Sequence, residues 1–90
     1  MDKTLTPLIT KHLSEDEALV LQQIYEDDEA DARLLALQLG MGRGHLMQAI
    51  ASLRRKHLID IQRSYEGVWI RISSQGRRLM RYIWPEAALV

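Results

Sequence analysis

The sequence predicts a small α+β domain, mostly helical, in which three helices are followed by a two-stranded hairpin and a last helix. Three observations predict it. Apolar residues recur at helical spacing through the first two thirds of the chain, and the period changes to two between Ile59 and Ile72. A helix-capping residue, Ser73, follows at once. The 90 residues suffice for one domain with a hydrophobic core.

The first helix of this domain is predicted to begin after Ser14 and to run to about Tyr25. Ser14 and Glu17 have the spacing of a capping box, in which each side chain accepts a hydrogen bond from the backbone N–H of the other. The acidic run from Glu26 to Glu29 follows. It is expected to be a loop or a frayed helix end.

The second and third helices are separated by a short glycine-containing turn. The second is expected over about 31–39, where Gly40 supplies a stop signal. The third is expected over about 43–56, because apolar residues at i, i+4 and i+7 make a core stripe there. That stripe consists of Leu46, Ile50 and Leu53.

A β-hairpin is predicted after the third helix. Apolar and polar residues alternate over 59–63 and again over 68–72. Between the two runs lies Tyr65-Glu66-Gly67, in which glycine allows the positive φ of a tight turn.

The last helix is expected to start at the N-cap Ser73 and to continue through about Trp84, because Pro85 ends it. Tyr82 and Trp84 are expected to pack against the core as a C-terminal plug.

The predicted order of helix, helix, helix, hairpin and helix is that of a winged helix-turn-helix. Residues 14–84 would form this domain. Residues 1–13 would form a short N-terminal helical segment, since Thr6-Pro7 can begin a helix to about His12. Residues 85–90 would form a C-terminal tail.

Three stretches resemble MarR-family transcriptional regulators of bacteria and archaea. Leu35-Ala36 followed by Leu39-Gly40 is similar to the second-helix signature of that family. Leu53 to Ile59 resembles the end of its recognition helix, and Ile72 to Leu79 resembles the Leu-Thr-x-x-Gly stretch that follows its wing. The resemblance covers about residues 14–84 and implies a winged-helix fold, which ArsR-like and PadR-like regulators share.

The chain departs from the MarR pattern in four places. Its wing turn is short, and the long terminal helices that dimerise the family are missing or reduced. Gly42 and Gly44 replace the usual Ser or Thr at the start of the recognition helix. His57 replaces a frequent glycine after that helix, at a place that often needs a left-handed backbone.

The resemblance implies that the third helix enters the major groove of double-stranded DNA and that its first residues meet base edges. Arginine can pair with guanine and glutamine with adenine, each worth about 1–3 kcal/mol of discrimination. Met47 fits a core position equally well, and plain solvent exposure is the alternative for the polar residues. The candidate base-reading residues are Arg43, Gly44, His45, Met47 and Gln48.

A second set of residues would contact the DNA backbone from the end of the third helix, the wing and the start of the last helix. Cations at a helix C-terminus also stabilise the helix dipole, by about 0.3–1 kcal/mol, without any ligand. A solvated helix face is the alternative for Arg77. The candidate backbone-contacting residues are Arg54, Arg55, Arg63, Tyr65, Arg71, Ser73 and Arg77.

The second helix is apolar nearly all round, because Leu34 and Leu37 flank its core positions. Exposed apolar surface of this kind is typical of a dimer or partner interface. Alternatively, the N-terminal segment folds over it. Two-fold DNA sites need two copies of the domain, so a homodimer is expected.

Charge is segregated along the chain although its net value is zero. Residues 1–40 hold nine acidic against three basic residues, and residues 41–90 hold the reverse. A molecule of this kind can bind a polyanion with its basic face.

Composition disfavours several other classes of protein. The absence of cysteine excludes thiolate metal sites and fits the cytoplasm. No apolar run is long enough to span a membrane. His12, His45 and His57 fall on different elements, and the acids have no partner nucleophile, so neither a metal site nor an enzyme is expected.

The sequence therefore predicts a cytoplasmic, homodimeric, sequence-specific DNA-binding regulator that needs no cofactor. The alternative is a winged-helix module or subunit that binds another protein through Leu34, Leu37 and the acidic face.

Overall fold

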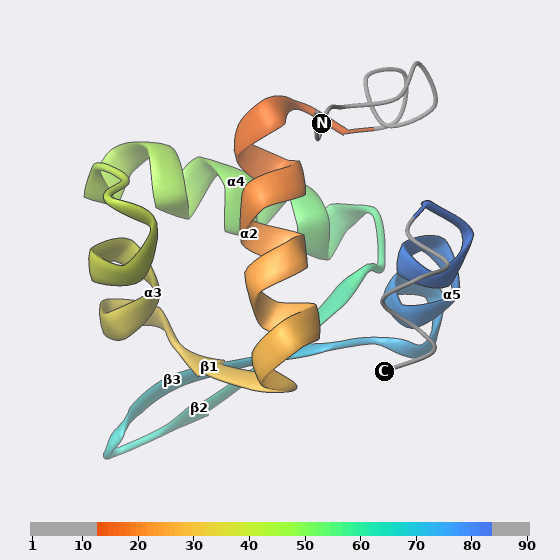
Figure 1. Ribbon diagram of the computed structural model, residues 1–90. Coiled ribbons are helices and arrows are strands. Elements are labelled where there is room, and N and C mark those ends of the chain that lie inside the picture. The colour runs from red at the N-terminus through yellow and green to blue at the C-terminus, as the bar shows by residue number, and fades with distance from the viewer. Residues whose placement is uncertain (1–12, 84–90) are drawn as a thin grey trace.

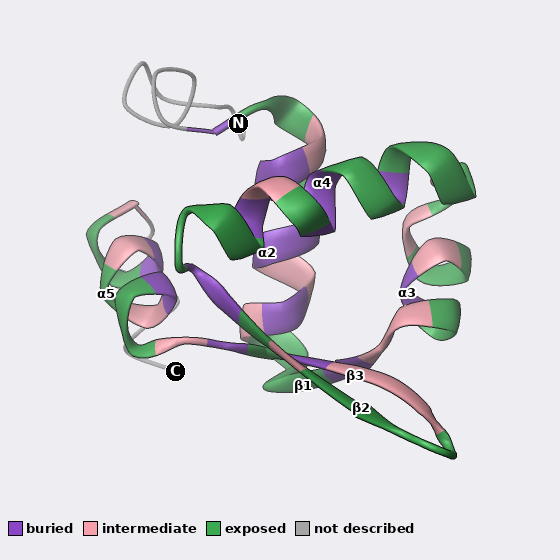
Figure 2. Cartoon of the chain, turned by 180° about the vertical axis from the view of Figure 1, so that it is seen from behind, coloured by how far each residue is buried: buried purple, intermediate pink, exposed green. Residues whose placement is uncertain are grey.

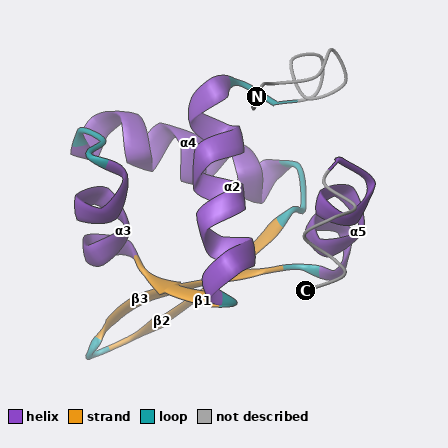
Figure 3. Cartoon of the chain, viewed as in Figure 1, coloured by secondary structure: helices purple, strands orange, loops and turns teal. Residues whose placement is uncertain are grey.

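The computed structural model describes residues 13–83, which form four α-helices and one antiparallel sheet of three strands (Figures 1 and 3). The helices are α2 (Glu15–Asp27), α3 (Ala32–Leu39), α4 (Arg43–Arg55) and α5 (Ser74–Ile83). The strands are β1 (Glu29–Asp31), β2 (Ile59–Ser64) and β3 (Gly67–Ile72). The predicted winged helix-turn-helix is confirmed.

The helix α2 crosses α4 at the centre of the molecule, and the sheet lies beneath both (Figure 1). α3 and α5 lie on opposite sides of this centre (Figure 1). The largest fully buried side chains come from all four helices and from β3, and each such burial contributes about 1.5–3 kcal/mol. They are Val20, Leu21, Ile24, Leu35, Leu53, Ile70 and Met80.

The start of α2 is fixed by the predicted capping box. Ser14 Oγ accepts from the Glu17 backbone N–H at 3.1 Å, and Glu17 Oε1 accepts from the Ser14 N–H at 2.7 Å. The helix continues to Asp27, and Asp28 then takes a positive φ of 70°.

One element, the strand β1, was not expected. Residues 26–29 were predicted to be a loop or a frayed end, whereas the helix includes Asp27 and a strand begins at Glu29. This strand pairs with β3, so β3 becomes the central strand and the wing is part of a three-stranded sheet. Acidic residues are poor strand formers, and three residues are too few to show a period of two. The backbone pairing with β3 creates this strand.

The start of α5 packs tightly on the loop between α4 and β2. Ser73 Oγ donates to the His57 carbonyl at 2.7 Å and accepts from the Gly76 N–H at 3.0 Å. A Cβ on Gly76 would lie 2.2 Å from the Leu58 carbonyl oxygen, so only glycine fits. His57 has a φ of 63°, which confirms the expected left-handed backbone.

Two aromatic expectations have different outcomes. Tyr82 is 70% exposed, so its predicted place in a C-terminal plug is wrong. Its helix turns Met80 toward the core instead, and Tyr82 falls on the outer face. Trp84, the expected N-terminal helix and the C-terminal tail lie outside the described residues. Within residues 13–83, no helix is long and apolar enough to cross a membrane.

Candidate nucleic-acid interface

The helix α4 has one buried and one exposed face. Its buried residues are Leu46, Ala49, Ile50 and Leu53. The opposite face is exposed along the helix, as Figure 2 shows from behind the view of Figure 1. All five candidate base-reading residues are exposed, and Met47, which also fitted a core position, is 51% exposed. The structure therefore leaves the start of α4 open to a ligand.

Gly44 is the second residue of α4 and is exposed. A Cβ added to it would meet no described atom within 4 Å, and its φ is not positive. Glycine within a helix costs about 1 kcal/mol relative to alanine. Neither packing nor backbone conformation in residues 13–83 requires glycine here, and its absent side chain lets another molecule approach the helix backbone closely.

The five candidate base-reading residues turn toward different sides of α4. Arg43 and Met47 line a hollow on the side of the wing. His45 and Gln48 line a smaller hollow on the side of α2, where His45 Nδ1 lies 3.8 Å from an Asp16 carboxylate oxygen. The five candidate residues therefore lie in the first half of α4, but their side chains do not converge on a single site.

On the side of α2, an ion pair anchors the end of α4. Lys56 Nζ donates to the two Glu17 carboxylate oxygens at 2.9 and 3.1 Å, and Glu17 is only 5% exposed. Burial raises the pKa of the Glu17 carboxyl. Hydrogen bonds from Ser52, the Ser14 backbone and Lys56 lower it, and their combined effect puts the pKa below its ordinary value. Arg54, Arg55 and Lys56 are all exposed, but Lys56 is also paired with the buried Glu17 carboxylate.

On the side of the wing, α3, α4 and the hairpin enclose a cleft of about 590 Å³. Its floor is apolar and includes Met47, Ile61 and Val68. Three elements each supply one exposed arginine to the cleft. These are Arg33 from α3, Arg43 from α4 and Arg63 from β2. Sequence reasoning missed Arg33, because its proximity to the wing depends on the pairing of β1 with β3.

The two wing arginines face opposite sides of the sheet. Arg63 alternates in phase with Ile59 and Ile61, which face α4. Arg71 lies between the buried Ile70 and Ile72 and so points to the other face. There its cross-strand partners are two acidic residues, Glu29 and Asp60. The cleft therefore includes Arg63 and excludes Arg71.

The remaining candidate backbone-contacting residues differ in whether they contact other residues of the chain. Tyr65 is fully exposed at the wing turn. Ser73 is occupied as the cap of α5, and Arg77 donates to the Asp28 carboxylate. Both therefore have structural roles in this chain.

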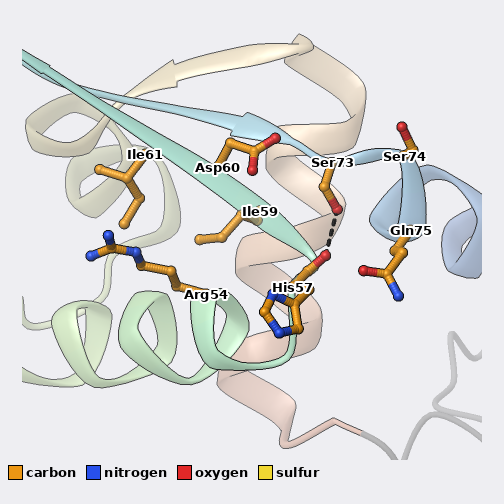
Figure 4. Close-up of a pocket in the computed structure, with 8 residues that line it drawn as sticks. All are labelled: Arg54, His57, Ile59, Asp60, Ile61, Ser73, Ser74 and Gln75. Atoms are coloured by element: carbon orange, nitrogen blue, oxygen red, sulfur yellow. Dashed lines mark hydrogen bonds between the residues drawn. The ribbon is translucent and has the colours of Figure 1, made fainter.

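A further hollow of about 540 Å³ lies between the end of α4, β2 and α5 (Figure 4). Arg54 and His57 flank it from one side and Ser74 and Gln75 from the other, with the Ser73–His57 hydrogen bond at its edge.

Among the described residues, no group of three or more His, Asp or Glu side chains could hold a metal ion.

The exposed face of α3 carries two leucines beside Arg33 and Gln38, so it is less apolar than the sequence indicated. Leu35 is fully buried, whereas Leu34 is 56% and Leu37 79% exposed. No described part of the chain covers these two leucines.

Comparisons with known proteins show which fold this is. The sequence matches no family model, and no curated protein matches it. Solved structures do match: NadR in complex with 4-hydroxyphenylacetate has a TM-score of 0.79 and 18% identity over 89% of this chain and 60% of that one. BpsR of Bordetella bronchiseptica gives 0.77 and 15%, over 89% and 59%.

A MarR-family transcriptional regulator from Silicibacter pomeroyi gives a TM-score of 0.77 and 18% identity, over 86% of this chain and 54% of that one. The chain thus has the winged-helix fold of MarR-type transcriptional regulators. It spans about three fifths of the length of the first solved structures that it matches.

Proposed function

We propose that this protein is a transcriptional regulator that binds double-stranded DNA in a sequence-specific way. The observation that carries the proposal is the exposed start of α4, where polar side chains surround a glycine that residues 13–83 do not require. The fold supports it, since BpsR, which shares the fold, is described as having its DNA binding regulated by 6-hydroxynicotinic acid.

In this proposal α4 lies in the major groove and the wing follows the backbone toward the minor groove. Arg43 would pair with guanine and Gln48 with adenine, while Met47 would contact a thymine methyl. His45 would reach a base edge or a phosphate, and Gly44 would let the helix backbone approach the DNA closely.

Phosphate contacts would supply most of the affinity. The residues best placed for them are Arg54 and Arg55 at the end of α4, with Arg63 and Tyr65 on the wing, because all four are exposed. Arg71, Ser73 and Arg77 are weaker candidates, since one faces the other side of the sheet and two are occupied within the chain.

The regulator would act as a homodimer, because two-fold DNA sites require two recognition helices. Leu34 and Leu37 are the candidate contact surface, since both are exposed on one face of α3.

The proposal is tested by fluorescence anisotropy of a labelled random-sequence duplex, titrated between about 50 and 200 mM salt. The Arg43→Ala/Arg63→Ala variant is compared with Arg78→Ala/Arg81→Ala, which removes the same charge from exposed positions of α5. Wild-type binding should weaken steeply with salt. The first variant should bind on the order of thirtyfold more weakly, with a salt slope smaller by about one, because Arg63 contacts a phosphate and Arg43 a base. Absence of binding at the lowest salt would overturn the proposal.

The second candidate function is a module that binds protein through α3 and the acidic face, and the exposure of Leu34 and Leu37 favours it. Such binding would depend on apolar contact and would change little with salt. Two results together would favour this function. The wild-type protein would not bind DNA at low salt, and it would self-associate only while both leucines are present.

A further inference from the structure

The cleft between α4 and the wing combines two kinds of surface. Its floor is formed by aliphatic side chains from α4 and both wing strands, among them Met47, Ile61 and Val68. Three arginines also line the cleft, and all three are exposed. They are Arg33, Arg43 and Arg63. A ligand that fits such a cleft must carry negative charge at its edge and apolar surface toward the floor.

Arg33 differs from the other two arginines because it is held in place. Asp31 accepts from Arg33 Nε at 3.3 Å and from Nη2 at 3.1 Å, and it also caps the helix by accepting from the Arg33 backbone N–H at 2.8 Å. These contacts lower the pKa of Asp31 and raise the pKa of Arg33. The pair is therefore charged at any ordinary pH.

The two partners of this ion pair differ in exposure. The Asp31 side chain is only 9% exposed, whereas that of Arg33 is 77% exposed. Asp31 takes the Nε proton and one Nη2 proton, so the remaining guanidinium N–H groups point away from the carboxylate. The acid thus orients the arginine without covering it.

The orientation brings the guanidinium to the turn end of the wing. A Cβ on Gly67 would lie 3.5 Å from Arg33 Nη2, so the two are neighbours. Asp31 itself is the β1 partner of Trp69 on β3, which ties its position to the sheet. Arg33 therefore lies between the helix that would read the major groove and the wing that would reach the minor groove.

We infer that this cleft holds the sugar–phosphate backbone of one DNA strand, with Arg33 binding a phosphate and Asp31 acting as its positioning residue. The inference rests on the proposed function. A strand that separates the major from the minor groove must pass between α4 and the wing. Its phosphates meet Arg33 and Arg63, and its deoxyribose carbons meet the apolar side chains of Ile61 and Val68.

The test measures duplex affinity against salt for Arg33→Ala, with Arg78→Ala as the matched loss of one exposed α5 charge. Arg33→Ala should weaken binding about fivefold and lower the salt slope by about one, uniformly across duplex sequences. Arg78→Ala should change both much less.

Asp31→Asn distinguishes positioning from charge. The substitution removes a negative charge beside the cleft, so electrostatics alone would strengthen binding. Loss of positioning would weaken binding about twofold, with a smaller salt slope. Asparagine caps a helix as well as aspartate does, so α3 is retained, and far-UV circular dichroism checks this.

An Arg33→Ala variant indistinguishable from Arg78→Ala, or an Asp31→Asn variant that binds more tightly than wild type, would overturn the inference. Neither result would contradict the proposed function. That function fails only if the wild type itself does not bind DNA.

Discussion

The two sides of α4 use charge in opposite ways. On the side of α2, the buried Glu17 carboxylate is fully engaged by Lys56 and by the Ser14 backbone. On the side of the wing, arginines stand exposed around an apolar floor. Removing one partner of a buried ion pair destabilises a fold, whereas an exposed charge is available to a ligand. Substitution of Glu17 or Lys56 should therefore change stability, and substitution of the arginines on the wing side should change binding.

The largest expected effect is on the α2 side. Glu17→Ala removes half of the capping box and the carboxylate that Lys56 Nζ contacts, so the free energy of unfolding should fall by about 2–3 kcal/mol. Urea denaturation measures it. Glu15→Ala, an exposed acid in the same helical turn, is the control and should cost no more than about 0.5 kcal/mol. Equal losses in the two variants would show that the ion pair does not stabilise the fold.

Acidification should break the same ion pair without a substitution. The folded-state pKa of Glu17 is lowered, so its contribution to stability is present above the unfolded value of about 4.3 and is lost as pH falls through the folded value. The stability difference between wild type and Glu17→Gln should narrow from pH 7 to pH 3. A difference that stays constant over this range would contradict the shift.

On the exposed face, Gly44→Ala should separate stability from binding. Alanine is the better helix former by about 0.5–1 kcal/mol, and no described atom opposes its Cβ, so thermal stability should rise. DNA affinity should fall, because in the proposed complex the added methyl group would lie between the helix backbone and the DNA. Ala51→Gly, also exposed on α4, is the converse control and should lose stability. If Gly44→Ala bound DNA as well as wild type, close approach at this position would be excluded.

The smallest effect on folding is expected for Leu34→Ser/Leu37→Ser. Both side chains are more than half exposed, so unfolding should change by no more than about 0.5 kcal/mol. Sedimentation equilibrium of the variant and the wild type tests the proposed dimer surface. Identical association in the two would place the interface elsewhere.

The sequence predicted elements whose signals are local. The capping box at Ser14, the left-handed Gly40 and His57, and the cap of α5 depend on residues a few positions apart, and all are present. The opposite orientations of Arg63 and Arg71 were also visible in the alternation with isoleucines. Their shared charge nevertheless favours a backbone contact for both, although this alternation places them on opposite faces.

The cleft was not predictable in this way. Arg33 reaches it only because Asp31 is in register with Trp69, a contact between residues far apart in sequence. The role of Lys56 was hidden for the same reason, since Arg54, Arg55 and Lys56 look alike as a basic run and only its distance to Glu17 separates it. Pairings between distant segments carry no short-range pattern.

The short strand β1 also divides the wing mechanically. It pairs with residues 69–71 of β3, so this stretch has a neighbouring strand on both edges, whereas Gly67 and Val68 pair with β2 alone. Amide hydrogen exchange should therefore be slow from Trp69 to Arg71 and fast toward the turn. We expect the outer half of the hairpin to bend more readily than its inner half, which would let the proposed DNA-binding wing adjust to grooves of different width.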